Sequence, residues 1–337
     1  MATRVFPGPT GLTIALAAVA LAAFAVSLVT GPADLTFAQM LGGLFGTADT
    51  SSTLIMQELR LPRALLTALC GAGLGMAGAA LQGLLRNPLA SPDLLGTGNA
   101  AAFGAVAILA LGIAGTGSLI LPLAAVSASL VSIGALLWLS GRDARPLTVI
   151  LAGLALSTFA GALVALTLNL APNDFLALEI AFWLLGSFSD RSMVHVAIAA
   201  PFIAGGMALM LSQRRLIAAL TLGEETARSL GTDTPLRRTA LLVGVAATVG
   251  AQVAVSGVVG FIGLVVPHLV RPLTGGRPDK VLVPSALAGA AVLSIADIAV
   301  RALPTIGELK IGVLTALVGA PFFFLLVARE RASRDIG

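Results

Sequence analysis

The stretch RLPRALLTALCGAGLGMAGAALQGLLRNPLASPDLLGTGNAAAFGAV, residues 60–106, decides the fold of this chain. It contains an apolar, glycine-rich helix, a polar break at Asn87-Pro88, and the start of a second apolar helix. The first helix can cross a bilayer, which takes about 20 apolar residues. Gly71, Gly75 and Ala79 follow the spacing at which membrane helices approach closely. We expect this face to pack against another helix; direct contact with a transported molecule is the alternative.

The composition extends this interpretation to the whole chain. Charged residues make up 11% of it, against about 25% in soluble domains, and hydrophobic residues make up 57%. Mean hydropathy is +1.00. So few charges cannot cover a water-soluble surface, and the apolar runs are continuous rather than alternating, which favours helices over a barrel. The chain is predicted to be an all-α polytopic membrane protein.

Hydropathy and helix breakers predict about ten spans, which leave no room for a sizeable soluble domain, so residues 1–337 are expected to form one transmembrane domain. Glycines and a proline interrupt the eighth span, which predicts a broken or half helix. The first span could be a signal peptide, but its apolar core exceeds the usual ~7–15 residues. The expected spans are 12–29, 62–84, 95–114, 118–140, 147–170, 193–212, 239–256, 257–272, 281–302 and 310–328.

Arginine and lysine counts set the orientation. With ten spans and both termini in the cytoplasm, fifteen of the 20 basic residues lie inside and five outside. The five outside cations oppose this trend and need a reason. They are Arg60, Arg63, Arg191, Arg301 and Lys310.

Three of these arginines are predicted near the outer ends of spans. Pro62 suits a first helical turn, which places Arg60 and Arg63 at the start of the second span. Arg301 lies at the end of the ninth. Headgroup binding by snorkelling side chains is one explanation; a cationic patch that docks carboxylates of an external partner is the other. Asp297, four residues before Arg301, is expected to form an i,i+4 pair with it, with a proton relay as the alternative.

The longest cytoplasmic connection, about residues 213–238, contains LGEETARSLG at 222–231. Gly223 and Gly231 bracket a short helix, in which Glu224 and Arg228 have the spacing of a favourable pair. This compact knob is either a solvated connector or a lever that fits a motor subunit. The chain has no Walker A loop, so any ATP hydrolysis that drives it must occur on another chain.

The break at Asn87-Pro88 has two interpretations. Pro88 disfavours helix at Asn87, which predicts a tight turn. The same loop could form an inner gate, with Leu89 as a hydrophobic plug.

The sequence offers no catalytic or metal-binding set. One cysteine, two histidines and no tyrosine give few ligands for a transition metal. No Ser/His/Asp set, HExxH pattern or paired carboxylates support an enzyme. The modest net charge of +4 fits membrane orientation better than nucleic-acid binding.

Several long motifs resemble the FecCD-type permeases, the membrane subunits of binding-protein-dependent ABC importers for ferric siderophores, haem and cobalamin. The resemblance covers about residues 55–328. The motifs are RLPR at 60–63, GAALQGLLRNPLASPDLLGTGNAAAFGA at 78–105, LGEETARSLG at 222–231, GFIGLVVPHLVR at 260–271, ADIAVR at 296–301 and GELKIGVLTALVGAPFF at 307–323.

The resemblance implies a type II ABC importer permease fold in the bacterial inner membrane. It implies ten helices per subunit and a permease homodimer or heterodimer with the pathway at its axis. Two ATP-binding subunits, which hold ATP and Mg²⁺, and a periplasmic substrate-binding protein complete the importer. No cofactor is expected in this chain itself.

The resemblance also assigns roles to residues. Arg60, Arg63 and Arg301 match arginines that dock the binding protein, and Asn87 and Leu89 match an inner gate. The fifth span matches the helix that lines the path; its entrance at Arg145-Pro146-Leu147-Thr148 departs from the small polar residues of relatives, which leaves the second part of the gate unassigned. The expected ATPase-coupling residues are Leu222, Gly223, Glu224, Glu225, Arg228 and Gly231.

The expected cargo is a chelated metal, first of all a ferric siderophore. Haem and cobalamin are alternatives within the family. An ion-coupled secondary transporter is the alternative of another class, for which Asp297 is the one candidate relay carboxylate.

Overall fold

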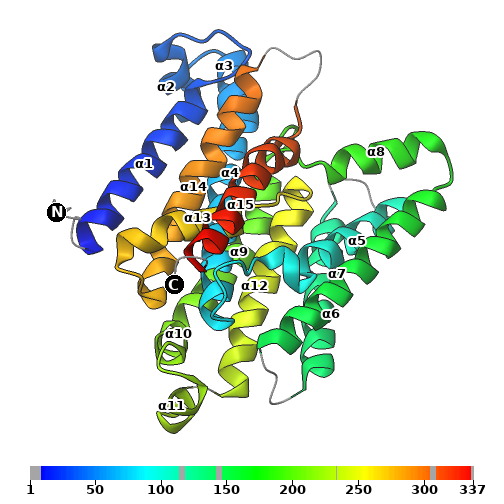
Figure 1. The fold of residues 1–337 in the computed structure, drawn as a ribbon. Helices are drawn as coiled ribbons and strands as arrows, with labels where there is room; N and C mark the ends of the chain where they lie inside the picture. Colours follow the sequence, from blue (N-terminus) through cyan, green and yellow to red (C-terminus); the bar gives the residue numbers. More distant parts are fainter. Residues whose placement is uncertain (1–8, 114–117, 142–145, 233, 304–308, 335–337) are drawn as a thin grey trace.

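The computed structural model describes residues 9–113, 118–141, 146–232, 234–303 and 309–334, and within these ranges every regular element is a helix (Figure 1). Each of the ten expected spans contains a helix, as predicted. These helices are α1 (Pro9–Val29), α4 (Leu61–Leu84), α5 (Thr97–Ala110), α6 (Ile120–Ser140), α7 (Pro146–Asn169), α9 (Met193–Ser212), α12 (Pro235–Ser256), α13 (Ile262–Val270), α14 (Pro278–Ala302) and α15 (Ile311–Arg334).

The helices differ in how much membrane they can cross. Within the described ranges, seven are long and apolar enough to span a bilayer, the longest being the continuous run Thr50–Leu84. The apolar helices at Thr97–Ala110 and Ile262–Thr274 are shorter, and the apolar stretch Ile311–Leu326 belongs to the 24-residue helix α15. The eighth span is therefore broken, as expected, and the third is also short.

Helix α4 lies at the centre of the molecule, where it packs against α14, α13, α9 and α12. In the most apolar windows of α4 and α12, 78% of residues are buried, against 17% in α1 and α7. The first pair therefore forms the core, and the second pair presents its surface to lipid or to a partner. Figure 1 shows α1 beside α14 on one flank and α5, α6 and α7 on the other.

Small residues let the central helices touch through their backbones. Added Cβ atoms at Gly71 and Gly75 would overlap the carbonyl oxygens of Gly289 and Ser285 on α14, and one at Gly78 would overlap that of Gly263 on α13. Lipid gives no hydrophobic drive for helix association, so close packing of this kind holds membrane bundles together. The packing interpretation of the glycine motif is confirmed.

The second span begins earlier than predicted. Helix α3 (Thr50–Leu54), the π-helical turn η1 (Ile55–Arg60) and α4 run on continuously, so Pro62 lies inside a long helix and not in its first turn. Proline has no N–H for the regular bond and crowds the preceding turn. The wider π-helical turn directly before it accommodates this defect.

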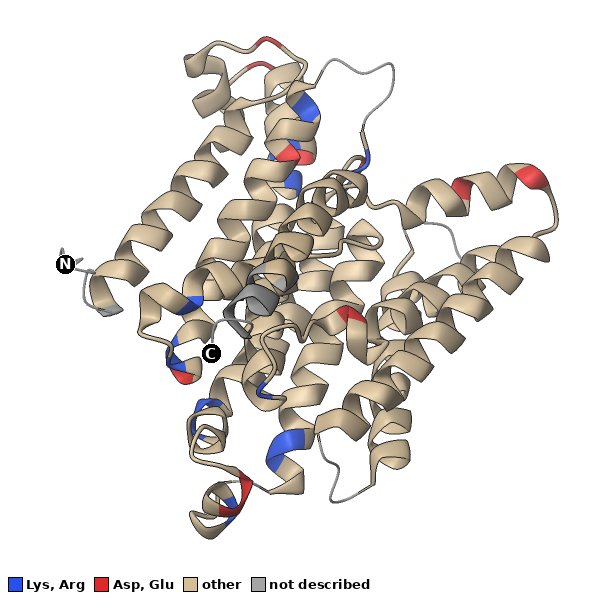
Figure 2. Ribbon diagram, in the orientation of Figure 1, with Lys and Arg blue, Asp and Glu red and all other residues tan. Residues whose placement is uncertain are grey.

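Short helices gather at the two ends of the molecule. Helices α2 (Phe37–Phe45), α3 and α8 (Asp174–Leu184) lie toward one end, and α10 (Arg214–Leu220) and α11 (Glu224–Ser229) lie at the other (Figure 1). Most charged residues also lie toward these ends, and the middle is nearly free of them (Figure 2). This distribution is that of a chain whose central layer meets lipid.

Candidate functional site

The outer arginines are bonded to helix ends. The guanidinium of Arg60 donates to the carbonyl oxygens of Leu28 (3.1 Å), Val29 (2.9 Å) and Ala33 (2.6 Å). Arg301 donates to those of Ser27 (3.0 Å) and Thr30 (2.6 Å). The last carbonyls of a helix have no partner within it and carry partial negative charge. The two arginines therefore cap the C-terminus of α1.

Arg191 repeats this arrangement on another helix. Its Nε donates to the carbonyl oxygen of Val255 (2.5 Å), in the last turn of α12. Burial lowers the pKa of Arg191, and the neighbouring Asp190 opposes that shift. The capping of helix C-termini thus explains three of the five cations that the charge count places outside.

Asp297 lies between Arg63 and Arg301 and pairs with both. Its carboxylate, 1% exposed, accepts bonds from Arg63 (2.8–3.1 Å) and pairs with Arg301 at 3.0 Å. The expected i,i+4 pair is confirmed. A carboxylate held by two guanidiniums is poorly placed to relay protons.

The side chains of Arg60, Arg63 and Arg301 are largely buried. Arg60 is 5% exposed, and the side chains of Arg63 and Arg301 are 14% and 7% exposed. Snorkelling to lipid headgroups is excluded because their guanidiniums are bonded to this chain. Docking to a binding protein stays a prediction. Among the described residues, the cluster has three cations for one carboxylate, so this part of the chain keeps surplus positive charge.

At the opposite end, called the inner end because the charge count predicts that it faces the cytoplasm, the loop after α4 forms the predicted tight turn. Arg86 adopts a left-handed conformation (φ +48°), and the side-chain oxygen of Asn87 accepts a bond from the Leu89 amide (2.9 Å). The Ala90 amide donates to the carbonyl of Asn87 (3.1 Å). Asn87 and Leu89 are both half-buried. Their role as a gate stays a prediction.

After this turn the chain goes back into the bundle. The Pro92 ring lies 2.9 Å from where a Cβ on Gly263 would be, and Gly263 faces Gly78. Gly78 precedes the end of α4 by six residues, about 9 Å along the helix axis. The 3₁₀-helix η2 (Pro92–Leu95) and the start of α5 therefore lie about 9 Å above the inner end of α4. This explains why α5 is short.

In the break before the eighth span, hydrogen bonds from neighbouring residues satisfy the backbone carbonyls. Between α12 and α13, Phe261 adopts φ +67°. The carbonyl of Ser256 accepts a bond from the Ser187 amide (2.8 Å), and the Gln252 side chain donates to the carbonyl of Gly257 (2.9 Å). Irregular backbone at membrane depth needs partners of this kind. The break is thus a built feature of the bundle.

Asp93, in η2, is a residue that the sequence analysis missed. Its carboxylate oxygens lie 3.5 Å and 4.0 Å from where Cβ atoms on Gly98 and Gly260 would be, so it sits where the broken helices meet. The side chain is exposed, and it forms no ion pair with any described residue. A carboxylate at this depth is costly against lipid and usually faces a watery passage. The sequence signal that could have identified Asp93 is an isolated acidic residue between two apolar segments.

The short helix predicted between Gly223 and Gly231 is present as α11 and stands at the inner tip, and its role in coupling stays a prediction. Gly223 (φ +103°) and Gly231 (φ +65°) bracket α11. Ala227 anchors the helix in the interior, whereas Leu222 and Leu230 are 64% and 59% exposed. Large exposed apolar side chains at an aqueous end typically mark a protein interface.

Of the charged residues in α11, Glu225 and Arg228 are exposed and Glu224 is half-buried. The Glu224 carboxylate lies 3.5 Å from Arg86 and 3.9 Å from Arg238. It therefore ties α11 to the residue directly before the Asn87-Pro88 turn and to the start of α12. Arg145, at the predicted entrance of the fifth span, lies outside the described residues.

Several known proteins resemble this chain in sequence and in fold. The profile of the FecCD transport family matches residues 19–329. The Fe(3+) dicitrate transport system permease protein FecD of Escherichia coli is 40% identical over 278 residues, 82% of this chain and 86% of FecD. The hemin transport system permease protein HmuU of Yersinia pestis is 36% identical over 83% of this chain and 85% of HmuU.

A solved structure shows that the similarity extends to the three-dimensional fold. An ABC transporter solved in an inward-facing conformation superposes with a TM-score of 0.82 at 32% identity, covering 94% of this chain and 98% of that chain. The family match and this structure agree with the predicted fold of an ABC importer permease. The chain belongs to the FecCD transport family.

Proposed function

We propose that this chain is the permease subunit of a binding-protein-dependent ABC importer whose cargo is a chelated metal, first of all a ferric siderophore. Its relatives are named for Fe(3+) dicitrate, hemin and cobalamin transport. The observation that carries the proposal is the ion pair between Glu224 and Arg86. It joins α11 at the inner tip to the Asn87-Pro88 turn, from which the chain goes back into the bundle.

The proposed assembly places each partner on one end of the molecule. Residues 1–337 form one transmembrane unit that pairs with a second permease subunit in the bacterial inner membrane, with both termini in the cytoplasm. Two ATP-binding subunits, which hold ATP and Mg²⁺, meet α11 and its exposed leucines. A periplasmic binding protein meets the end that carries the arginine cluster.

The proposed mechanism is alternating access driven at the inner tip. Movement of the ATP-binding subunits displaces α11, and Glu224 transmits the displacement to Arg86. Arg86 directly precedes Asn87, so the turn that holds Leu89 moves with it. Nucleotide shifts the equilibrium only as far as its subunits contact the two states differently.

The docking proposal uses the surplus charge of the outer cluster. Only Arg63 and Arg301 pair with the Asp297 carboxylate, and Arg60 bonds backbone carbonyls. Carboxylates of a binding protein would supply further acceptors for the three guanidinium forks. Because Arg60 and Arg301 also hold the end of α1, docking would act directly on that helix.

Two features of the passage bear on the cargo. A chelated metal arrives with its ligand shell filled, so it needs no histidine or cysteine ligands, and the described residues contain no cluster of such groups. Asp93 gives the junction of the broken helices a hydrogen-bond acceptor for a chelator. Haem and cobalamin are the alternative cargoes. An ion-coupled transporter is disfavoured because its candidate relay, Asp297, is held in ion pairs.

A charge reversal at Glu224 tests the bridge. In the reconstituted importer, Glu224→Arg is expected to lower transport per ATP hydrolysed about tenfold, within the usual range of coupling between sites. Stability should barely change, because half-exposed ion pairs contribute about 0–1 kcal/mol. Uptake of chelate and release of phosphate are measured on the same vesicles.

The double variant Glu224→Arg/Arg86→Glu restores the pair with reversed sign. It should regain part of the lost coupling, and not all of it, because the introduced guanidinium then lies beside that of Arg238. The exposed neighbour provides a matched control, so Glu225→Arg should keep more coupling than Glu224→Arg. Equal losses in the three variants would contradict the proposed link.

A further inference from the structure

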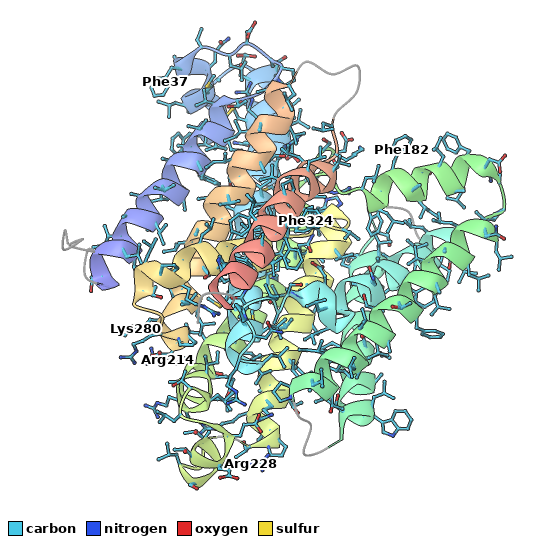
Figure 3. The ribbon with its side chains drawn as sticks, in the orientation of Figure 1. Phe37, Phe182, Arg214, Arg228, Lys280 and Phe324 are labelled. Atoms are coloured by element: carbon cyan, nitrogen blue, oxygen red, sulfur yellow. The ribbon has the colours of Figure 1, made fainter. Side chains whose placement is uncertain are left out.

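Two adjoining pockets near the inner ends of α9 and α14 are lined by basic residues. One encloses about 400 Å³ and the other about 770 Å³, and both are lined by Arg214 and Arg215. Lys280 completes the smaller pocket, and Arg237 lines the larger. Cavities of 300–1,000 Å³ suit small ligands. Figure 3 shows Arg214 and Lys280 on the same flank of the molecule.

The cations of the smaller pocket have no anion of their own. Arg214, Arg215 and Lys280 are exposed, and no described residue forms an ion pair with any of them. The one carboxylate in the lining, Asp279, pairs with Arg277 at 3.0 Å. The pocket therefore presents a concentrated positive charge without a counter-ion from the described part of the chain.

The position of the pocket points to the membrane. Arg214 follows the last turn of α9, and Lys280 lies in the first turn of α14, so both cations lie at the inner boundary of spanning helices. Thr13 of α1 forms another part of the wall. Its neighbour Ile14 is 64% exposed, and Val283 beside Lys280 is 38% exposed. Polar headgroup contacts and apolar chain contacts thus lie side by side.

We propose that Arg214, Arg215 and Lys280 form a binding site for the phosphodiester headgroup of an anionic phospholipid. Basic pockets between spanning helices on the cytoplasmic side bind such headgroups. The phosphate satisfies the cations, and the acyl chains lie along Ile14 and Val283. A bound lipid joins α10 to α14 and α1, and so braces the start of the segment that carries α11.

The occupant is a lipid and not an ATP-binding subunit, because part of the wall comes from α1. In the most apolar window of α1 only 17% of the residues are buried, so this apolar helix leaves most of its surface open to acyl chains. An acidic patch of a soluble subunit would reach the cations from the inner tip, below Ile14. The two occupants predict different losses when the cations are removed.

The test uses the purified, delipidated full chain in a neutral detergent. Cardiolipin and phosphatidylethanolamine are titrated separately, and bound lipid is counted by native mass spectrometry. Wild type should bind cardiolipin more tightly. Arg214→Gln/Lys280→Gln should weaken cardiolipin binding about thirtyfold, given the usual gain per charge near an anionic surface. Arg228→Gln/Lys310→Gln removes the same charge elsewhere and should bind as wild type does.

Further experiments distinguish a lipid headgroup from free phosphate, and loss of the site from misfolding of a variant. Excess inorganic phosphate should not displace cardiolipin, since it lacks acyl chains. Arg214→Lys/Lys280→Arg keeps both charges and should retain the lipid, and Lys280→Gln against Lys310→Gln serves if the double variant does not fold. Equal loss in the matched pair, no preference for the anionic lipid, or displacement by phosphate would overturn the site. The site would also be overturned if Arg214→Gln/Lys280→Gln no longer bound the ATP-binding subunits but bound cardiolipin as wild type does.

Discussion

Replacing Gly78 with leucine is expected to leave little folded protein. A side chain at this position would occupy the place of the Gly263 carbonyl oxygen, so α4 and α13 would have to separate at the centre of the bundle. Overpacking a core costs about 1–3 kcal/mol where side chains can move, and here the obstacle is backbone. The yield of monodisperse chain after size-exclusion chromatography and its melting temperature measure the loss.

Gly205→Leu is the matched control for this prediction. Gly205 lies in α9, another spanning helix, and a Cβ there would meet nothing within 4 Å. Its yield and melting temperature should stay close to wild type. Similar behaviour of the Gly78 and Gly205 variants would mean that α4 and α13 do not touch through their backbones.

Replacing Asp297 with alanine should cause the second large loss. Removing it leaves Arg63 and Arg301 without the carboxylate between them, and breaking a buried ion pair costs about 3–5 kcal/mol. The side chain of Asp297 is 1% exposed, so solvent would not replace the lost charge. Reversible unfolding in mixed micelles gives the change in the free energy of unfolding.

Asp279→Ala is the comparison, because its pair with Arg277 is 59% exposed on the arginine side and should contribute about 0–1 kcal/mol. A loss for Asp297→Ala no larger than that for Asp279→Ala would contradict the structural role of the cluster. The same reasoning affects tests of docking. Substitutions at Arg60 or Arg63 remove contacts inside the chain, so a docking defect is informative only for a variant whose stability is measured.

Local patterns in the sequence predicted much of the fold. Continuous apolar runs located the ten spans in each of which the structure has a helix, and Gly257, Gly260 and Pro267 predicted the broken eighth span. Helix α8 was missed because its 11 residues are too short for a window of about 19 residues, which averages them with polar neighbours. The start of the second span at Thr50 was missed because Pro62 resembles a first-turn proline.

Tertiary partners explain where the site differs from expectation. Sequence spacing predicted Asp297–Arg301, which are neighbours on one helix. It could not predict that Arg60 bonds the end of α1 or that Glu224 reaches Arg86, since those partners are distant in the chain. Asp93 was treated as part of a connector, because nothing in its local sequence indicates that the loop goes back into the bundle.

The central claim is that this chain moves its cargo only when separate nucleotide-driven subunits act on its inner tip. The most direct measurement is uptake of a ferric siderophore into vesicles that contain the chain, its ATP-binding subunits and its binding protein. Uptake should stop when ATP is absent from the side of α11 and should continue when ionophores collapse the ion gradients. Uptake that persists without ATP, or that stops with the gradients while ATP is present, would contradict the account.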